Sequence, residues 1–129
     1  MTDSKIKPTE KELEILQALW SMGPSTVRAV NEFLSVSNAV GYTTTLKLMQ
    51  IMFDKGILDR KKQGKTHVYQ PLISEETTQQ QLLDKLLNTA FRGSAMKLVM
   101  QALGNQKSSK KELDQIRAYL DKLEDDNEK

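Results

Sequence analysis

The segment that most limits how this chain can fold lies between residues 25 and 72. Within it, residues 42–55 repeat apolar side chains at helical spacing and stop at a glycine. At about 100° per residue, Thr45, Met49 and Met52 fall within one narrow arc, which we expect to be buried. The opposite arc is polar. The pattern therefore predicts an amphipathic helix that covers a small core and leaves one polar side free.

The residues after this helix, 57–69, have the signals of a β-hairpin with a strong positive charge. Five lysines and arginines stand against one aspartate between Lys55 and Lys65, a net charge of +4 in eleven positions, although the whole chain carries only +2. A helix with small polar residues at its N-terminus can enter the major groove of DNA, and a cationic ribbon can lie along phosphates. Solvation of the hairpin by its lysines explains the same charge without any partner.

Two further helices are predicted before this helix and hairpin. Thr9 and Glu12 have the spacing of a capping box, which begins a helix, and Gly23-Pro24 has the signals that end one. We expect Ser25 to cap the next helix and the small polar residues 35–41 to form a turn. Three helices and a hairpin within about seventy residues match a winged helix-turn-helix module.

The rest of the chain, residues 73–129, predicts only helices. We expect Ser74 and Ser94 to begin two of them, residues 104–108 to form a linker, and Ser109 to begin the last helix. Their apolar sides are narrow and have few other elements to pack against, which favours burial against a partner.

The simplest partner for these helices is a second copy of the chain related by a two-fold axis. The alternative is that they fold back on the winged helix as an intramolecular lid. The residues expected in the dimer contact are Leu82, Leu83, Leu86, Leu87, Leu113, Ile116, Leu120 and Leu123. The predicted fold is therefore mainly α with a small β-hairpin: a winged helix-turn-helix DNA-binding domain at residues 1–72, followed by a helical dimerisation domain at residues 73–129.

The candidate DNA contacts follow from which part of such a module reaches the duplex. The N-terminal half of a recognition helix meets base edges, and lysine and glutamine side chains there read guanine and adenine respectively. The candidates on this helix are Tyr42, Thr43, Thr44, Lys47 and Gln50. The candidates for phosphate contact are Arg28 at the start of the preceding helix and Arg60, Lys61, Lys62 and Lys65 in the hairpin. Thr44 as a helix cap and Tyr42 as a packing residue are the alternatives.

Composition argues against several other classes of function. The chain has no cysteine and one histidine, so thiolate chemistry is excluded and a histidine zinc site is not expected. His67 has no nucleophile signature beside it, and no glycine-rich phosphate loop occurs, so we do not expect an enzyme or a cofactor. Neither a signal peptide nor an apolar run of about 20 residues is present, so we expect a cytoplasmic protein without membrane contact.

These residues, taken in order, resemble the penicillinase-repressor family, the winged-helix repressors of bacteria of the BlaI, MecI and CopY type. The matching segments are residues 13–20, 41–46, 52–58 and 64–71, with the Lys-Gly pair after the recognition helix and a wing that ends in Tyr-x-Pro. The resemblance implies a homodimeric repressor that binds a palindromic operator and dimerises through its C-terminal helices. It also implies DNA contacts by the hairpin lysines and by Tyr42, Thr43, Thr44 and Lys47.

Three departures from the family pattern bear on regulation. Copper-responsive members carry a C-terminal cysteine motif, which this chain lacks. Members that respond to β-lactams are cleaved at an Asn-Phe bond, where this chain has Gln101-Ala102. Ile51 stands where relatives often have a basic residue, which leaves room for an alternative function: a winged-helix module that binds an acidic protein partner.

Overall fold

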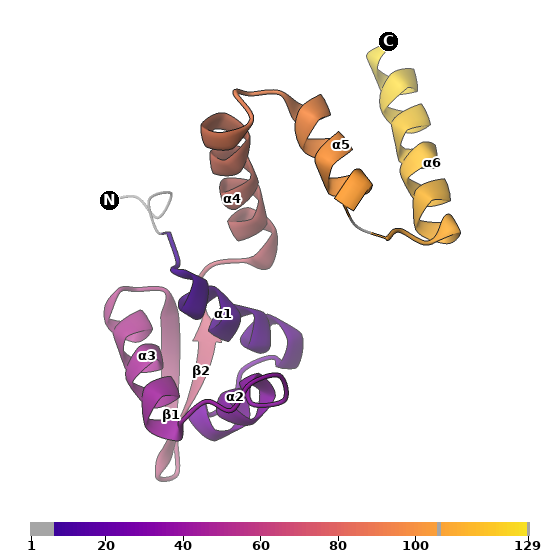
Figure 1. The fold of residues 1–129 in the computed structure, drawn as a ribbon. Coiled ribbons are helices and arrows are strands. Elements are labelled where there is room, and N and C mark those ends of the chain that lie inside the picture. Colours follow the sequence, from indigo (N-terminus) through magenta and orange to yellow (C-terminus); the bar gives the residue numbers. More distant parts are fainter. Residues whose placement is uncertain (1–6, 106, 129) are drawn as a thin grey trace. The chain divides into compact units, whose positions relative to one another are not determined.

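The computed structural model describes residues 7–105 and 107–128, which form mainly helices and one two-stranded antiparallel sheet (Figure 1). The elements are α1 (Glu10–Met22), α2 (Val27–Leu34), α3 (Tyr42–Asp54), β1 (Leu58–Gln63), β2 (Thr66–Pro71), α4 (Glu75–Ala90), α5 (Ala95–Asn105) and α6 (Lys110–Asn127). This confirms the predicted fold class. The chain divides into two compact units, and the division along the sequence falls within α4, between Gln81 and Leu82.

The capping box predicted for the first helix is present at the start of α1. The Glu12 backbone N–H donates to Thr9 Oγ1 at 3.2 Å, and the Thr9 backbone N–H donates to Glu12 Oε1 at 3.0 Å. Two of the backbone donors that a helix start leaves unpaired are thereby satisfied. The helix ends at Met22, and the C-cap that follows is Gly23, whose φ of 87° is easily adopted only by glycine.

The cap of α2 differs from the prediction. Thr26, and not Ser25, is the N-cap, and its Oγ1 accepts from the Ala29 backbone N–H at 3.2 Å. The backbone N–H and C=O of Ser25 instead pair with Tyr69 at 3.0 and 2.8 Å. This isolated bridge holds Ser25 in an extended conformation beside β2, so the helix can begin only after it.

The turn between α2 and α3 is held by hydrogen bonds from one side chain. The predicted turn residues separate the two helices, and α3 follows Gly41 as its N-cap, so Thr44 lies within the helix and does not cap it. Asn31 on α2 donates from Nδ2 to Val40 O at 2.8 Å and to Thr45 Oγ1 at 2.9 Å. One amide group therefore ties α2 to both the turn and the recognition helix.

The core of the first unit lies between the three helices and the base of the hairpin. Its fully buried apolar side chains come from α1, α2, α3 and the hairpin: Ile15, Leu16, Ala18, Leu19, Val30, Met49, Met52, Ile57, Leu58 and Tyr69. Each large side chain of this kind contributes about 1.5–3 kcal/mol when it is buried.

The segment that enters α4 packs with the winged helix. Trp20 Nε1 donates to Ile73 O at 3.2 Å, and Thr78 is buried with its hydroxyl on Ser74 O. Ser74 caps α4 as predicted, since its Oγ accepts from the Thr77 backbone N–H. Residues 73–81 thus belong to the first compact unit. The division into two functional domains at residue 72 stays a prediction.

The second unit, from Leu82 onward, consists of the rest of α4 together with α5 and α6. Ser94 and Ser109 cap α5 and α6 as predicted. The linker predicted from Gly104 is wrong at its start, because α5 continues through Asn105. Glycine lowers helix stability by only about 1 kcal/mol relative to alanine, so Gly104 alone does not end the helix.

Candidate nucleic-acid interface

The recognition helix α3 has one buried and one exposed side. Thr45, Met49 and Met52 are buried, as the helical wheel predicts. The five candidate DNA contacts on this helix, Tyr42, Thr43, Thr44, Lys47 and Gln50, are all exposed. Because the apolar residues fix the rotation of the helix against the core, its polar side faces solvent along the N-terminal half.

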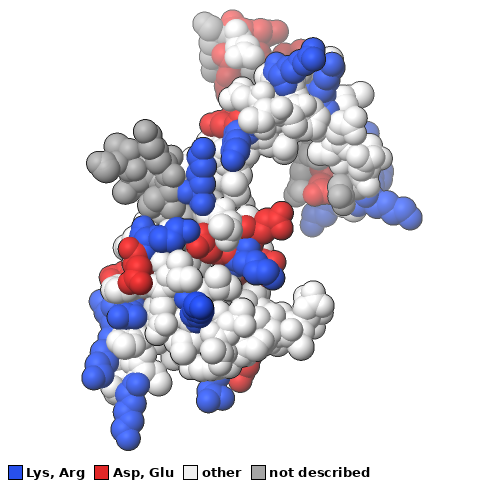
Figure 2. All heavy atoms as spheres, turned by 60° about the vertical axis from the view of Figure 1, so that its left-hand side comes forward, with Lys and Arg blue, Asp and Glu red and all other residues white. Residues whose placement is uncertain are grey.

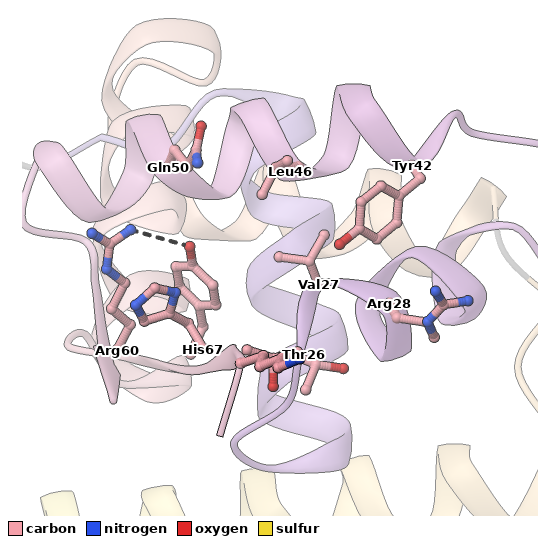
Figure 3. A pocket seen from close by; sticks show the side chains of 11 residues that line it. Thr26, Val27, Arg28, Tyr42, Leu46, Gln50, Arg60 and His67 are labelled. Atoms are coloured by element: carbon pink, nitrogen blue, oxygen red, sulfur yellow. Dashed lines mark hydrogen bonds between the residues drawn. The ribbon is translucent and has the colours of Figure 1, made fainter. Parts of the chain in front are cut away.

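An open cleft lies where α2, α3 and the hairpin meet (Figure 3). Its volume is about 520 Å³. It brings together five of the predicted contact residues: Arg28, Tyr42, Gln50, Arg60 and Lys65. Thr43, Thr44, Lys47, Lys61 and Lys62 are exposed but do not line it. Residues from three elements therefore share one solvent-open surface.

Some residues of this cleft were not selected from the sequence as contacts. They are Thr26, Val27, Leu46, Thr66, His67 and Tyr69. Thr26 is there because it caps α2, and helix N-termini are common partners of phosphate groups. The His67 and Tyr69 rings meet edge to face, with centroids 6.4 Å apart. No local sequence signal marks them, since their place depends on how the hairpin packs.

Arg28 and Tyr42, which both line the cleft, lie close to each other (Figure 3). The guanidinium carbon of Arg28 on α2 lies 6.0 Å from the centroid of the Tyr42 ring at the start of α3. This distance is at the outer limit of a cation–π contact. Tyr42 is 47% exposed, so nearly half of its surface takes no part in packing.

The hairpin places its exposed lysines in the outer half of β1 and in the turn that follows it. Leu58 pairs with Pro71 and Gln63 with Thr66 in an antiparallel register, and Gly64 in the turn has a φ of 63°. Lys61, Lys62 and Lys65 are exposed. On the face of the molecule drawn in Figure 2, Lys and Arg side chains lie at the lowest part, at the height of the hairpin turn in Figure 1.

Arg60 differs from these lysines. Its guanidinium carbon lies 4.0 Å from the centroid of the Phe53 ring in the last turn of α3. Its Nη1 also donates to the Tyr69 hydroxyl at 3.4 Å (Figure 3). The side chain is half-buried, so this member of the basic run contacts the protein itself.

Lys55, which also belongs to the basic run, is paired with a buried carboxylate. Its Nζ lies 2.8 and 3.0 Å from the two carboxylate oxygens of Glu12. Burial alone would raise the pKa of Glu12, but hydrogen bonds from Lys55 and from the Thr9 backbone, together with the charge of Lys55, outweigh it and lower the pKa. The pair joins α1 to the C-terminal end of α3.

Among residues 7–105 and 107–128, no three histidine or acidic side chains are grouped so that they could hold a metal ion. In the same described part of the chain, every helix is too short or too polar to cross a bilayer.

Comparison with known proteins agrees with this geometry. The methicillin resistance regulatory protein MecI of Staphylococcus aureus is 21% identical over 122 residues, which cover 95% of this chain and 99% of that protein. The penicillinase repressor of Bacillus licheniformis is 24% identical over 113 residues, 88% of each chain. The solution structure of the DNA binding domain of the repressor BlaI matches with a TM-score of 0.50 at 25% identity, over 59% of this chain and 90% of that one.

The family model described as penicillinase repressor matches residues 8–122, which is most of the chain. This confirms the resemblance inferred from the sequence, and a family of repressors is not a family of enzymes. The chain belongs to the penicillinase repressor family, whose members are DNA-binding transcriptional repressors.

Proposed function

We propose that this protein represses transcription as a homodimer on a palindromic operator, with α3 in the major groove and the hairpin along the phosphate backbone. The observation that carries the proposal is the cleft between α2, α3 and the hairpin. There Tyr42 and Gln50 of α3 line the same open space as Arg60 and Lys65 of the hairpin. Groove and backbone can then be contacted together by one rigid unit.

The residues divide into those that read sequence and those that add affinity. Lys47 and Gln50 are the candidates for guanine and adenine edges, while Thr43 and Thr44 can bond phosphate or contact a thymine methyl group. Lys61, Lys62 and Lys65 are exposed and make no ion pair among the described residues, so their charge is available to phosphates. Arg28 is the candidate phosphate contact on α2.

The dimer part of the proposal is supported by apolar surface in the second unit. Leu86 is 47% exposed and Leu120 is 57% exposed, and α5 and α6 contain no buried residue. Helices of this kind gain stability when a second copy covers them. A two-fold dimer predicts an operator whose half-sites are about 10–10.5 base pairs apart, or a multiple of that.

The experiment compares two lysine variants on specific and unrelated duplexes over a range of salt. Lys47→Ala should lose selectivity between the duplexes. Lys62→Ala should weaken both alike and reduce the slope of log K against log salt by about 0.9. Lys111→Ala, an exposed lysine on α6, is the matched control and should bind as wild type. If both test variants bind as tightly and selectively as wild type, the proposed contacts are wrong.

The same titration separates this proposal from the alternative of a module for an acidic protein partner. That alternative predicts no duplex binding at physiological salt. If the protein represses transcription from chromosomal DNA, it acts in the cytoplasm. The test is whether a fluorescent fusion of the protein co-localises with the nucleoid.

A further inference from the structure

One basic residue of the hairpin is held against the protein while its neighbours are free. Leu58, Arg60 and Lys62 lie on the same face of β1, because side chains alternate along a strand. Leu58 is in the core and Lys62 is exposed, so Arg60 is the point at which this face leaves the protein interior.

The contacts of Arg60 connect two elements. Its guanidinium stacks on Phe53 of α3 at 4.0 Å, and it bonds to the hydroxyl of its own cross-strand partner, Tyr69. Phe53 itself packs against the core, and Tyr69 is buried and paired with Ser25. Both contact residues are therefore fixed, and Arg60 is fixed by them.

We propose that Arg60 is a positioning residue that sets the angle of the hairpin against the recognition helix, so that Lys61, Lys62 and Lys65 meet the phosphates in register with the base contacts of α3. A two-stranded ribbon has little stability of its own, and beyond the pair formed by Arg60 and Tyr69 neither strand of the hairpin has a buried residue. A planar guanidinium suits the role because it stacks on a ring and donates hydrogen bonds from its edge, which an ammonium cannot do together. This inference rests on the proposed function.

The test uses Arg60→Lys in the full-length protein, because this variant keeps the charge and removes the planar group. A residue that serves only as a phosphate charge tolerates the change. A positioning residue does not: an ammonium cannot reproduce the planar stacking on Phe53 together with the same bond to Tyr69, so we expect specific binding to weaken by about tenfold. The slope of log K against log salt should fall by about 1.8 or more, the value for at least two phosphate contacts. The control Lys62→Met should reduce it by about 0.9.

A second readout does not depend on DNA. Amide hydrogen exchange of residues 61–68 should be faster in Arg60→Lys than in wild type, with α1 and α2 unchanged. Phe53→Leu, which keeps the arginine and removes the ring, should give the same result. Wild-type exchange in both variants, or a wild-type salt slope in Arg60→Lys, would overturn the inference. A wild-type protein that binds no duplex would refute the proposed function instead, while the exchange measurement still decides the role of Arg60.

Discussion

The ion pair between Glu12 and Lys55 offers a sharp test of how α3 is held. Glu12→Gln keeps an oxygen that can accept from the Thr9 N–H, so the helix cap survives and only the charge is removed. The Glu12 side chain is 4% exposed and that of Lys55 is 44% exposed. Exposed pairs contribute about 0.2–1 kcal/mol, while breaking a fully buried pair costs about 3–5 kcal/mol.

The expected loss of stability lies between these limits. Lys55 can be solvated once its partner is neutral, so no buried charge is left unpaired. We expect Glu12→Gln to lower the free energy of unfolding by about 1–2 kcal/mol at pH 7. The assay is urea unfolding followed by the fluorescence of Trp20, the single tryptophan, which lies on α1 in the same unit. Glu14→Gln on the exposed side of α1 is the matched control.

The pH dependence gives the result that would refute this reasoning. Because the folded state lowers the pKa of Glu12 below its ordinary value of 4.5, its contribution is fully present above 4.5 and is lost as pH falls through the lowered pKa. The difference between wild type and Glu12→Gln should therefore narrow in acid. An unchanged difference at the lowest pH where unfolding is cooperative, or no difference at pH 7, would show that the pair does not stabilise the fold.

Three other variants test different parts of the structure. Met52→Ala removes a fully buried side chain and should lower the free energy of unfolding by about 2–5 kcal/mol in the same urea assay. Asn31→Ala frees the turn before α3 and should weaken specific DNA binding more than it lowers stability, as a titration beside urea unfolding would reveal. Leu120→Glu places a charge on the apolar side of α6 and should shift sedimentation from dimer toward monomer; an unchanged dimer would exclude this face.

Local patterns explain why much of the fold could be predicted from the sequence. The capping box at Thr9 and the buried arc of Met49 and Met52 depend on residues within one helix, where spacing and geometry are tightly linked. The predicted cap of α2 was wrong because Ser25 pairs with Tyr69. This partner is 44 positions away, and no local sequence pattern indicates the pairing.

The candidate site shows the same division. The helical wheel predicts that Lys47 and Gln50 are exposed, and the positive charge of the hairpin can be counted directly from the sequence. The sequence does not show that two residues of the basic run have partners in the protein. Lys55 forms an ion pair with a carboxylate 43 positions away, and Arg60 stacks on an aromatic ring of another element. Such pairs depend on how elements pack, so charge alone overstates what is free for DNA.

The measurement that tests the central proposal most directly is binding of the full-length protein to the DNA just upstream of its own gene. Fluorescent fragments of that region and an unrelated fragment are titrated at two salt concentrations. We predict tight binding to the upstream fragment alone, with affinity that falls steeply as salt rises. Equal and weak binding to both fragments, or none at physiological salt, would contradict a sequence-specific repressor.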